Sequence, residues 1–586
     1  MEYPKIPLAQ TVVELCKLKE IKHIVISPGS RNAPLTIGFT SDLYFNCYSI
    51  VDERCAAFFA LGIAQKLREP VAIACTSGSA VLNYYPAISE AYYSSIPLVV
   101  LSADRPKHLI GIGDGQTINQ KDVFGNHIIY SANLKLDINE NKPLKHREEI
   151  PIIKNLENKL ERMLGLQKNI QSFNEEEINK ALNLAKFKSG PVHINIPFDE
   201  PLYERVNTIS VDPKSTALSL KSSKIDQSEL KECIDDWYVA KRKMLLIGVM
   251  PPNQIDQRWL NDLANDDSVV VFTETTSNIH HPKFFPCIDK IIAPLESSDF
   301  SELQPDILIT IGGMIVSKKI KAFLRQYQPK HHWHIDEHNA NDTFFCLERH
   351  IIATPNEFFS EFLPKITHVT KSTYLEYWTK VKRHRNKMHQ LYIDKIPFSD
   401  FTVFSALIKS IPGKAILQLG NSSTVRYTQL FNINTHWEVF CNRGTSGIDG
   451  STSTAIGCAV ASKKQTVFIT GDLSFFYDSN ALWNNYIPKN FRIIIINNQG
   501  GGIFRILPGH KNTENFDYFF ETKHNLTAVQ LCDMYGFEYS TADDQEAVNS
   551  ELENFFKPSL QPKLLEIFTP RTENDSILLN YFDFIK

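Results

Sequence analysis

The sequence has no excess of charge of one sign and no block of like charge. Its 62 lysine and arginine residues nearly balance 66 aspartate and glutamate residues, which gives a formal net charge of −4. A general nucleic-acid binder relies on a basic face for its affinity. The charge balance therefore argues against a nucleic-acid partner, and it leaves open local basic pockets for small anions.

Disulfide patterns and long apolar runs are also missing. Ten cysteines are scattered along the chain without a CxxC pair, as is typical of reduced thiols in a cytosolic protein. No apolar run approaches the roughly 18 residues that indicate a membrane span. The first residues, MEYPKIPLAQ, lack the basic and apolar segments of a signal peptide. We expect a soluble, cytoplasmic protein without a membrane partner.

What the sequence does contain is an alternation of strand-length apolar runs and helical stretches, repeated in three parts. Apolar strands separated by helices predict parallel sheets covered on both faces. We therefore predict an α/β protein of three doubly wound parallel-sheet domains, over residues 1–195, 200–370 and 395–586, with a helical linker near 370–399 and exposed helices within 134–188. The predicted strands are residues 23–27, 71–75, 97–103, 190–202, 243–249, 269–274, 306–313, 332–336, 415–420, 465–470 and 492–496.

Two motifs in the third part carry oxygen ligands directly after predicted strands. Gly471-Asp472-Leu473 follows one strand, and Asn497-Asn498-Gln499-Gly500 follows the next. Neighbouring parallel strands would bring both loops to one sheet edge. The Asp472 carboxylate, the Asn498 amide oxygen and the Gly500 carbonyl suit Mg²⁺ (or Mn²⁺), with a diphosphate completing the shell. The alternative is that Asp472 caps the next helix and Asn-Asn is turn chemistry.

The spacing of GD and NN resembles the cofactor signature of thiamine-diphosphate enzymes of the decarboxylase-like type. The chain is more narrowly similar to the 2-succinyl-5-enolpyruvyl-6-hydroxy-3-cyclohexene-1-carboxylate synthases, the MenD family, in which GDL replaces the general GDG. The matching stretches are SPGSRNAPL (27–35), DERCAAFFALGIA (52–64), TSGSAVLNYYPA (76–87), LSADRP (101–106), GQTINQ (115–120), GNSSTVRY (420–427), NRGTSGIDGSTSTAIG (442–457) and NNQGGGIF (497–504).

This resemblance implies a pyrimidine-binding, a middle and a diphosphate-binding domain, in that order. It also implies that Glu53 is catalytic and hydrogen-bonds the aminopyrimidine ring of thiamine diphosphate. The apolar helix after Glu53 would support proton sharing with a ring nitrogen; alternatively, Glu53 is only a first-turn acid favoured by the helix dipole. The other cofactor-binding residues implied are Gln116, Ser422, Gly444, Ile448, Gly471, Asp472, Leu473 and Asn498, with Asp472, Asn498 and Gly500 on the metal.

The resemblance further implies a transferase of menaquinone biosynthesis that acts on 2-oxoglutarate and isochorismate, as a homodimer or dimer of dimers. Both substrates are dianions, and carboxylates need cations. The substrate-binding residues implied are Ser30, Arg31, Arg105, Gln116, Lys318, Lys319, Ser422, Arg426, Arg443 and Ile503. Lys318-Lys319 stands where we expect Lys-Arg, and lysine cannot form the bidentate fork of arginine. Each of these cations could alternatively be a solvated surface residue.

Two other functions remain as alternatives at this point. Another thiamine-diphosphate enzyme, such as an acetohydroxyacid synthase or a simple 2-oxoacid decarboxylase, would leave Arg31, Arg105 and Arg426 without a purpose. A nucleotide-binding regulatory protein would use the middle α/β domain, but no GxGxxG follows a strand there. Bound thiamine diphosphate would separate these classes.

Overall fold

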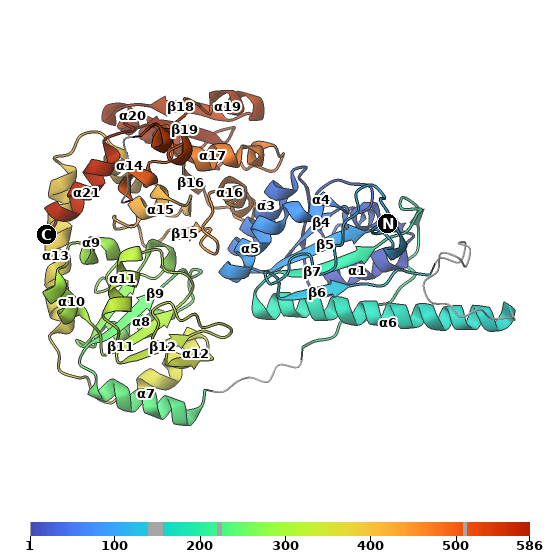
Figure 1. Ribbon diagram of the computed structural model, residues 1–586, viewed down its shortest axis with the longest axis horizontal. Helices are drawn as coiled ribbons and strands as arrows, with labels where there is room; N and C mark the ends of the chain where they lie inside the picture. The colour runs from blue at the N-terminus through green and yellow to red at the C-terminus, as the bar shows by residue number, and fades with distance from the viewer. Residues whose placement is uncertain (1, 139–155, 219–224, 508–512) are drawn as a thin grey trace. The chain divides into compact units, whose positions relative to one another are not determined.

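The structure is a computed structural model that describes residues 2–138, 156–218, 225–507 and 513–586 (Figure 1). The chain divides into two compact units. Unit 1 comprises Met1–Leu220 with Thr452–Lys463 and Asp478–Ile487, and unit 2 comprises the rest. Among the described residues, no helix combines the length and the apolar character that crossing a membrane requires.

Unit 1 contains a six-stranded parallel sheet in the order β3-β2-β4-β5-β7-β6. Its strands are β2 (His23–Ile26), β3 (Asn46–Ser49), β4 (Val71–Cys75), β5 (Leu98–Asp104), β6 (Tyr130–Asn133) and β7 (Val192–Pro197). Its main helices are α1 (Pro7–Leu18), α2 (Ala33–Ser41), α3 (Glu53–Leu67), α4 (Ser79–Asn83), α5 (Tyr85–Ser94) and α6 (Leu156–Lys188). The four predicted strands are all present, and they form the interior of this sheet.

Unit 1 differs from the prediction in one helix and in two edge strands. The sequence predicts one helix over residues 80–94, but the structure has two, α4 and α5, because Pro86 lies in the first turn of α5 and has no N–H to continue α4. β3 and β6 were not predicted, since these short edge strands are half-exposed and lack an apolar run. α6 confirms a helix in the 134–188 region, of which residues 139–155 lie outside the described residues.

Unit 2 contains two more parallel sheets. The first, in the order β10-β9-β11-β12-β13, comprises β9 (Lys243–Ile247), β10 (Val269–Thr273), β11 (Ile307–Ile311), β12 (His331–Ile335) and β13 (Arg349–Ile351). The second, in the order β15-β14-β16-β17-β19-β18, comprises β14 (Ile416–Leu419), β15 (Glu438–Cys441), β16 (Thr466–Gly471), β17 (Arg492–Asn497), β18 (Glu538–Ala542) and β19 (Lys563–Phe568). The α/β class with three parallel sheets is thus confirmed.

Helices flank both sheets of unit 2. They include α7 (Gln227–Val239), α8 (Gln257–Ala264), α9 (Ile288–Ile292), α10 (Ser297–Leu303), α11 (Lys318–Gln326), α12 (Pro355–Phe362), α13 (Tyr374–Ile393), α14 (Asp400–Ser410), α15 (Ser423–Thr428), α16 (Ser451–Val460), α17 (Asp472–Tyr477), α18 (Ile503–Ile506), α19 (Val529–Tyr535), α20 (Gln545–Phe555) and α21 (Asn574–Phe584). α13 confirms the expected helical linker. Of these helices, α16 divides between the units, because Thr452 and the residues after it belong to unit 1.

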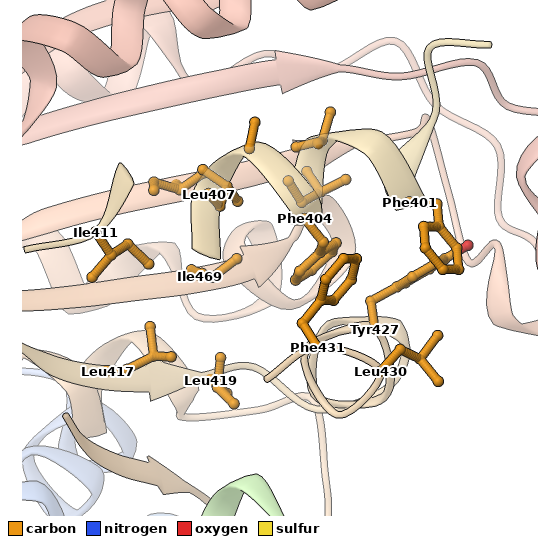
Figure 2. Packing of buried hydrophobic residues seen from close by; sticks show 14 of the residues in the cluster. Phe401, Phe404, Leu407, Ile411, Leu417, Leu419, Tyr427, Leu430, Phe431 and Ile469 are labelled. Atoms are coloured by element: carbon orange, nitrogen blue, oxygen red, sulfur yellow. The ribbon is translucent and has the colours of Figure 1, made fainter. Parts of the chain in front are cut away.

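The core of the last sheet lies between the strands and α14. Phe401, Phe404 and Leu407 project from one face of α14 toward Tyr427 of α15 and toward the strands (Figure 2). Phe404 and Tyr427 stack at a ring-centroid distance of 5.3 Å. Fully burying one such side chain contributes about 1.5–3 kcal/mol, so this packing fixes α14 and α15 against the sheet edge from which the candidate site is built.

Candidate active site

Four loops of the last sheet begin at the carboxyl ends of adjacent parallel strands. The strands are β15, β14, β16 and β17, in that order. The loops after them carry Arg443, Ser422, Asp472 and Asn498, respectively. The expectation that the Asp472 and Asn498 loops follow neighbouring strands is confirmed, and this sheet edge is where open α/β sheets bind ligands.

Asp472 is buried at the start of α17, with 2% of its surface exposed. Its Oδ1 accepts the N–H of the next residue, Leu473, at 2.7 Å. Its Oδ2 accepts the N–H of Gly500 at 2.9 Å, which links the two loops. His524 Nε2 lies 3.3 Å from the same oxygen without forming a hydrogen bond. Asp472 therefore presents a carboxylate oxygen to the loop after β17.

Asn498 is oriented by a second buried acid, Asp400, the first residue of α14. Asn498 Nδ2 donates to Asp400 Oδ2 at 3.2 Å, and the Thr569 hydroxyl donates to Asp400 Oδ1 at 2.6 Å. Burial raises the pKa of Asp400 to about 6; these two hydrogen bonds oppose the rise and the Asp472 charge adds to it. With its amide nitrogen bonded to Asp400, Asn498 keeps its amide oxygen as an acceptor for a ligand.

Two glycines show where this edge is open and where it is closed. A Cβ added to Gly471 would meet no atom within 4 Å, so the backbone before Asp472 faces open space. At Gly500 the φ angle is +150°, and a Cβ would lie 2.6 Å from the Glu521 carbonyl oxygen. Glu521 is itself held by ion pairs to Arg505 and Arg571. The Gly500 loop is thus fixed from behind, and the half-buried Ile503 follows it at the start of α18.

Asn421 ties the loop after β14 to the loop after β15. Its Nδ2 donates to the carbonyl oxygens of Asn442 and Gly447, both at 2.7 Å. Its Oδ1 accepts from Arg443 Nη1, also at 2.7 Å. Sequence reasoning missed Asn421, although it lies inside the GNSSTVRY stretch, beside Ser422.

The glycine-rich loop from Gly444 to Gly450 is also attached to α17. Ser474 Oγ donates to the carbonyl oxygen of Ile448 at 2.7 Å. The Ile448 side chain is 38% exposed, and Gly444 is buried. The loop is therefore a fixed part of the sheet edge, and Ile448 is free to contact a ligand.

Arg443 and Arg426 are two neighbouring guanidinium groups of unit 2. Arg443 is 7% exposed, and its buried Nε has no hydrogen-bond partner among the described residues. Arg426 Nη1 donates to the carbonyl oxygen of Ser422, whose φ is +69°, at 2.6 Å. Burial lowers the pKa of Arg426; repulsion from Arg443 lowers it further, and Asp289 opposes both effects. Such a pair is suited to an anion.

Lys318 and Lys319 are exposed residues in the first turn of α11. Asp289, on α9, accepts a hydrogen bond from the Ser317 hydroxyl at the start of the same helix. Burial raises the pKa of Asp289, and the charges of Lys319 and Arg426 oppose that rise. The charges of Lys319 and Arg426 thus both interact with the Asp289 carboxylate, a residue that the sequence did not point to. Lys318 has no comparable contact within the described chain.

In unit 1, Glu53 is the first residue of α3. Asp52 caps this helix through the N–H groups of Arg54 and Cys55 at 3.0 and 3.3 Å. Glu53 accepts a hydrogen bond from Asn83 Nδ2 at 3.1 Å. The helix from Cys55 to Ala64 is wholly buried, as predicted. The Glu53 carboxylate is only half-buried, because the first turn lies at the end of that apolar helix.

Arg31 and Arg105 follow β2 and β5 of the first sheet, respectively, and their positive charges repel one another. Arg31 is 5% exposed, and its Nη1 donates to the Phe198 carbonyl oxygen at 3.1 Å. Burial lowers the pKa of Arg31, and repulsion from Arg105 adds to this effect. Arg105 Nε lies 3.5 Å from Asp114 Oδ2. The buried Nε atoms of both arginines lack hydrogen-bond partners among the described residues.

The other two predicted residues of unit 1 lie on exposed loops. Ser30 is exposed directly before Arg31. Gln116 is exposed and has a φ of +53°. The Ser77 hydroxyl donates a hydrogen bond to the Gln116 carbonyl oxygen at 2.9 Å. Backbone contacts thus hold this loop in place and leave the Gln116 side chain directed to solvent.

Three family models match successive parts of the chain. The model "Thiamine pyrophosphate enzyme, N-terminal TPP binding domain" matches residues 6–123, and "Middle domain of thiamine pyrophosphate" matches residues 216–419. "Thiamine pyrophosphate enzyme, C-terminal TPP binding domain" matches residues 420–567. The three models follow the order of the three sheets, and the first and third contain Glu53 and Asp472, respectively.

Curated relatives match along the whole chain. Proteins named 2-succinyl-5-enolpyruvyl-6-hydroxy-3-cyclohexene-1-carboxylate synthase are 54% identical in Flavobacterium psychrophilum, over 99% of both chains, and 55% identical in Christiangramia forsetii, over 100% of both. The chain belongs to this synthase family. A member of the family from Porphyromonas gingivalis is 34% identical, over 98% of this chain and 96% of its own.

Membership of the synthase family makes thiamine diphosphate the cofactor, because the first and third family models are those of its binding domains. The nucleotide-binding alternative is therefore wrong. Asp400 and His524 have no signal within the sequence motifs: Asp400 lies 98 positions from Asn498 and meets it only through the fold.

Proposed function

We propose that this chain decarboxylates 2-oxoglutarate and adds the succinyl unit to isochorismate, giving 2-succinyl-5-enolpyruvyl-6-hydroxy-3-cyclohexene-1-carboxylate for menaquinone biosynthesis. The supporting observation is a set of guanidinium groups, on Arg31, Arg105 and Arg443, whose buried Nε atoms have no hydrogen-bond partner among the described residues. A buried N–H group without a hydrogen-bond acceptor is costly, so these groups fit a ligand rich in carboxylates. The relatives are named as synthases of the product proposed here.

We propose that Asp472, Asn498 and Gly500 hold Mg²⁺ or Mn²⁺ beside the diphosphate of the cofactor. The donors fit a hard cation: a buried carboxylate oxygen, an amide oxygen and a carbonyl from a loop fixed against Glu521. The open space above Gly471 fits a close approach of the diphosphate to the backbone. When bound, thiamine diphosphate supplies a carbon nucleophile and an electron sink for decarboxylation.

The remaining residues have roles in binding, orientation and proton transfer in this proposal. Glu53 holds a proton shared with the aminopyrimidine ring, and Asn83 fixes its carboxylate. Ile448, exposed on its anchored loop, packs against the cofactor. The other proposed cofactor contacts are Gln116, Ser422, Gly444, Gly471 and Leu473. The proposed substrate contacts are Ser30, Arg31, Arg105, Gln116, Lys318, Lys319, Ser422, Arg426, Arg443 and Ile503.

The test is analysis of products by mass spectrometry after incubation with thiamine diphosphate, Mg²⁺, 2-oxoglutarate and isochorismate. We expect a product that contains the carbon atoms of isochorismate and the four carbon atoms that remain of 2-oxoglutarate. Release of the four-carbon aldehyde alone would indicate a simple decarboxylase and contradict the proposal. Efficient use of pyruvate in place of 2-oxoglutarate would favour an acetohydroxyacid synthase instead.

We also propose that the active form is a cytoplasmic homodimer or dimer of dimers, with domains at 1–195, 200–370 and 395–586. Glu53 of one subunit would complete the site with Asp472 of its partner. Mixing the inactive variants Glu53→Gln and Asp472→Ala under subunit exchange should then restore activity, because the mixed dimer has one intact site. Proven exchange without recovery would contradict a shared site and leave the product assay unaffected.

A further inference from the structure

A cavity of about 210 Å³ lies in unit 2, between helices of its two sheets. It is roughly the space of seven liquid waters, smaller than a pocket for a drug-sized ligand. Its lining comes from α9, α13, α14 and the segment after α15. The lining residues are Lys290, Asn386, His389, Gln390, Ile393, Ser405, Ile408, Lys409, Phe431 and Asn432. None of them belongs to the cofactor or substrate residues proposed above.

Lys290 is the unusual member of this lining. It is only 2% exposed, on α9. Within the described part of the chain, its side-chain partner is the Cys287 thiol, and no carboxylate pairs with its ammonium group. The adjacent acid, Asp289, is bonded to Ser317 instead. An ammonium group buried without a counter-charge is strongly disfavoured, so Lys290 points to an anion that enters the cavity.

The charges around Lys290 are also positive. Lys409, exposed at the end of α14, and Lys290 both lower the pKa of His389, although burial is the main cause of its fall to about 3. His389 is therefore neutral at physiological pH, with Nδ1 bonded to the Tyr581 hydroxyl at 2.7 Å. Lys382 adds its charge near Lys290, while its own ammonium donates to two carbonyl oxygens.

Two hydrogen-bond acceptors near the cavity restrict the chemistry of the anion that it can bind. Asn386 Oδ1 is buried in the lining and has no donor among the described residues. Asp394, the residue after the lining residue Ile393, accepts a hydrogen bond from Gln390 Nε2 at 2.9 Å. A ligand that fits must therefore carry negative charge for the lysines and a hydroxyl donor for Asn386.

We propose that this cavity binds a small oxyanion that carries a hydroxyl group, either hydrogen phosphate or a hydroxycarboxylate. Lys290 and Lys409 bind the oxyanion, and Asn386 accepts a hydrogen bond from the hydroxyl. The ligand contacts α9, which flanks one sheet of unit 2, and also α13 and α14. Of these, α14 leads into the other sheet. It thereby stabilises the contact of these helices without touching the catalytic loops.

The test uses the holoenzyme with thiamine diphosphate and Mg²⁺, in a buffer without oxyanions. Inorganic phosphate, lactate and propionate are titrated while the melting temperature and Kd are measured. We expect a saturable rise with phosphate or lactate, and a weaker one with propionate, which lacks the hydroxyl. Lys290→Met should weaken binding at least about tenfold, as the loss of a charged hydrogen bond predicts. Lys387→Met, on the exposed side of α13, should bind as the wild type does.

The melting temperature without ligand separates an anion site from a structural lysine. Lys290→Met replaces an unpaired charge by an apolar chain, so it should raise the melting temperature in oxyanion-free buffer. A lower value would show that Lys290 is itself a structural cation, and would overturn the proposal. Equal stabilisation of Lys290→Met and wild type by the probes, or no stabilisation of either, would overturn it as well. A crystal soaked with arsenate, which carries a hydroxyl as hydrogen phosphate does, should place the anomalous peak beside Lys290, and a peak only at the arginines of the catalytic loops would contradict the site.

Discussion

Replacement of Arg426 by alanine should mainly impair the use of 2-oxoglutarate. Arg426 projects from α15, directly after the loop that carries Ser422, and it lies near Arg443. One of its nitrogen atoms, Nη1, is occupied by the Ser422 carbonyl oxygen at 2.6 Å. The rest of the guanidinium fork is available to bind the distal carboxylate of 2-oxoglutarate through parallel hydrogen bonds.

The expected magnitude follows from the two groups of contacts that the variant loses. A hydrogen bond to a charged group contributes about 1.5–3 kcal/mol, so kcat/KM for 2-oxoglutarate should fall roughly 10- to 100-fold. The bond to the Ser422 carbonyl oxygen contributes about 1 kcal/mol to the stability of the loop. That second loss affects every substrate equally, and relief of the repulsion from Arg443 offsets part of it.

The assay compares 2-oxoglutarate with 2-oxobutyrate, which has no distal carboxylate. Wild-type protein should use 2-oxobutyrate poorly, and Arg426→Ala should lose little more on it. Arg426→Lys keeps the charge without the fork and should fall between wild type and alanine. Arg383→Ala, an exposed residue of α13, serves as the control and should change neither value. An equal fall of kcat/KM for both acids would refute the carboxylate role of Arg426.

Three further predictions concern the proton, the metal and pH. Glu53→Gln should lower kcat by roughly 10²- to 10⁴-fold while calorimetry shows cofactor binding nearly unchanged; retention of most activity would remove Glu53 from the mechanism. Asp472→Ala should abolish the Mg²⁺ dependence of thiamine-diphosphate affinity in the same calorimetric titration, and an unaltered dependence would reject it as a metal ligand. Burial raises the pKa of Glu274 from 4.5 to about 7, so the folded chain keeps a proton that the unfolded chain releases, and this contribution to stability is lost as pH rises through about 7. Urea unfolding midpoints should therefore fall less between about pH 4.5 and about pH 7 in Glu274→Gln than in wild type, and parallel curves would reject the assignment.

The sequence predicted the interior strands better than the edges of the sheets. Buried strands such as β4 and β17 contain unbroken apolar runs. Such runs can be recognised in the sequence even though apolar and polar residues do not alternate in them. The edge strands β3, β6 and β18 are short and half-exposed, so their residues resemble those of loops. Our sequence reasoning also did not predict β19, although its KLLEIF run is buried and carries the same signal.

The candidate site was predictable where its residues directly follow strands. Asp472 and Asn498 have that position, and parallel pairing of β16 and β17 brings their loops to the same edge. Residues that reach the site from elsewhere have no such signal: Asp400 comes from α14 and Asp289 from α9. The half-burial of Glu53 also follows from tertiary packing, since the apolar sequence of α3 is the same whether or not its first turn is covered.

Like-charged neighbours give the site and the Lys290 cavity a common physical basis. Arg31 beside Arg105, and Arg426 beside Arg443, are pairs that repel one another in buried surroundings. Folding alone favours neither arrangement, because the nearby acids, Glu200 and Asp114 in unit 1 and Asp289 in unit 2, offset burial and repulsion only in part. Binding an anion reverses the sign of that contribution, so ligand and fold stabilise each other by linkage. An anion would offset the cost of burying Lys290 in the same way, but in a different geometry. The arginines lie in loops and in a short helix that follow strands, where a fork can bind planar carboxylates. Lys290 instead presents a point charge between helices, which suits a compact oxyanion.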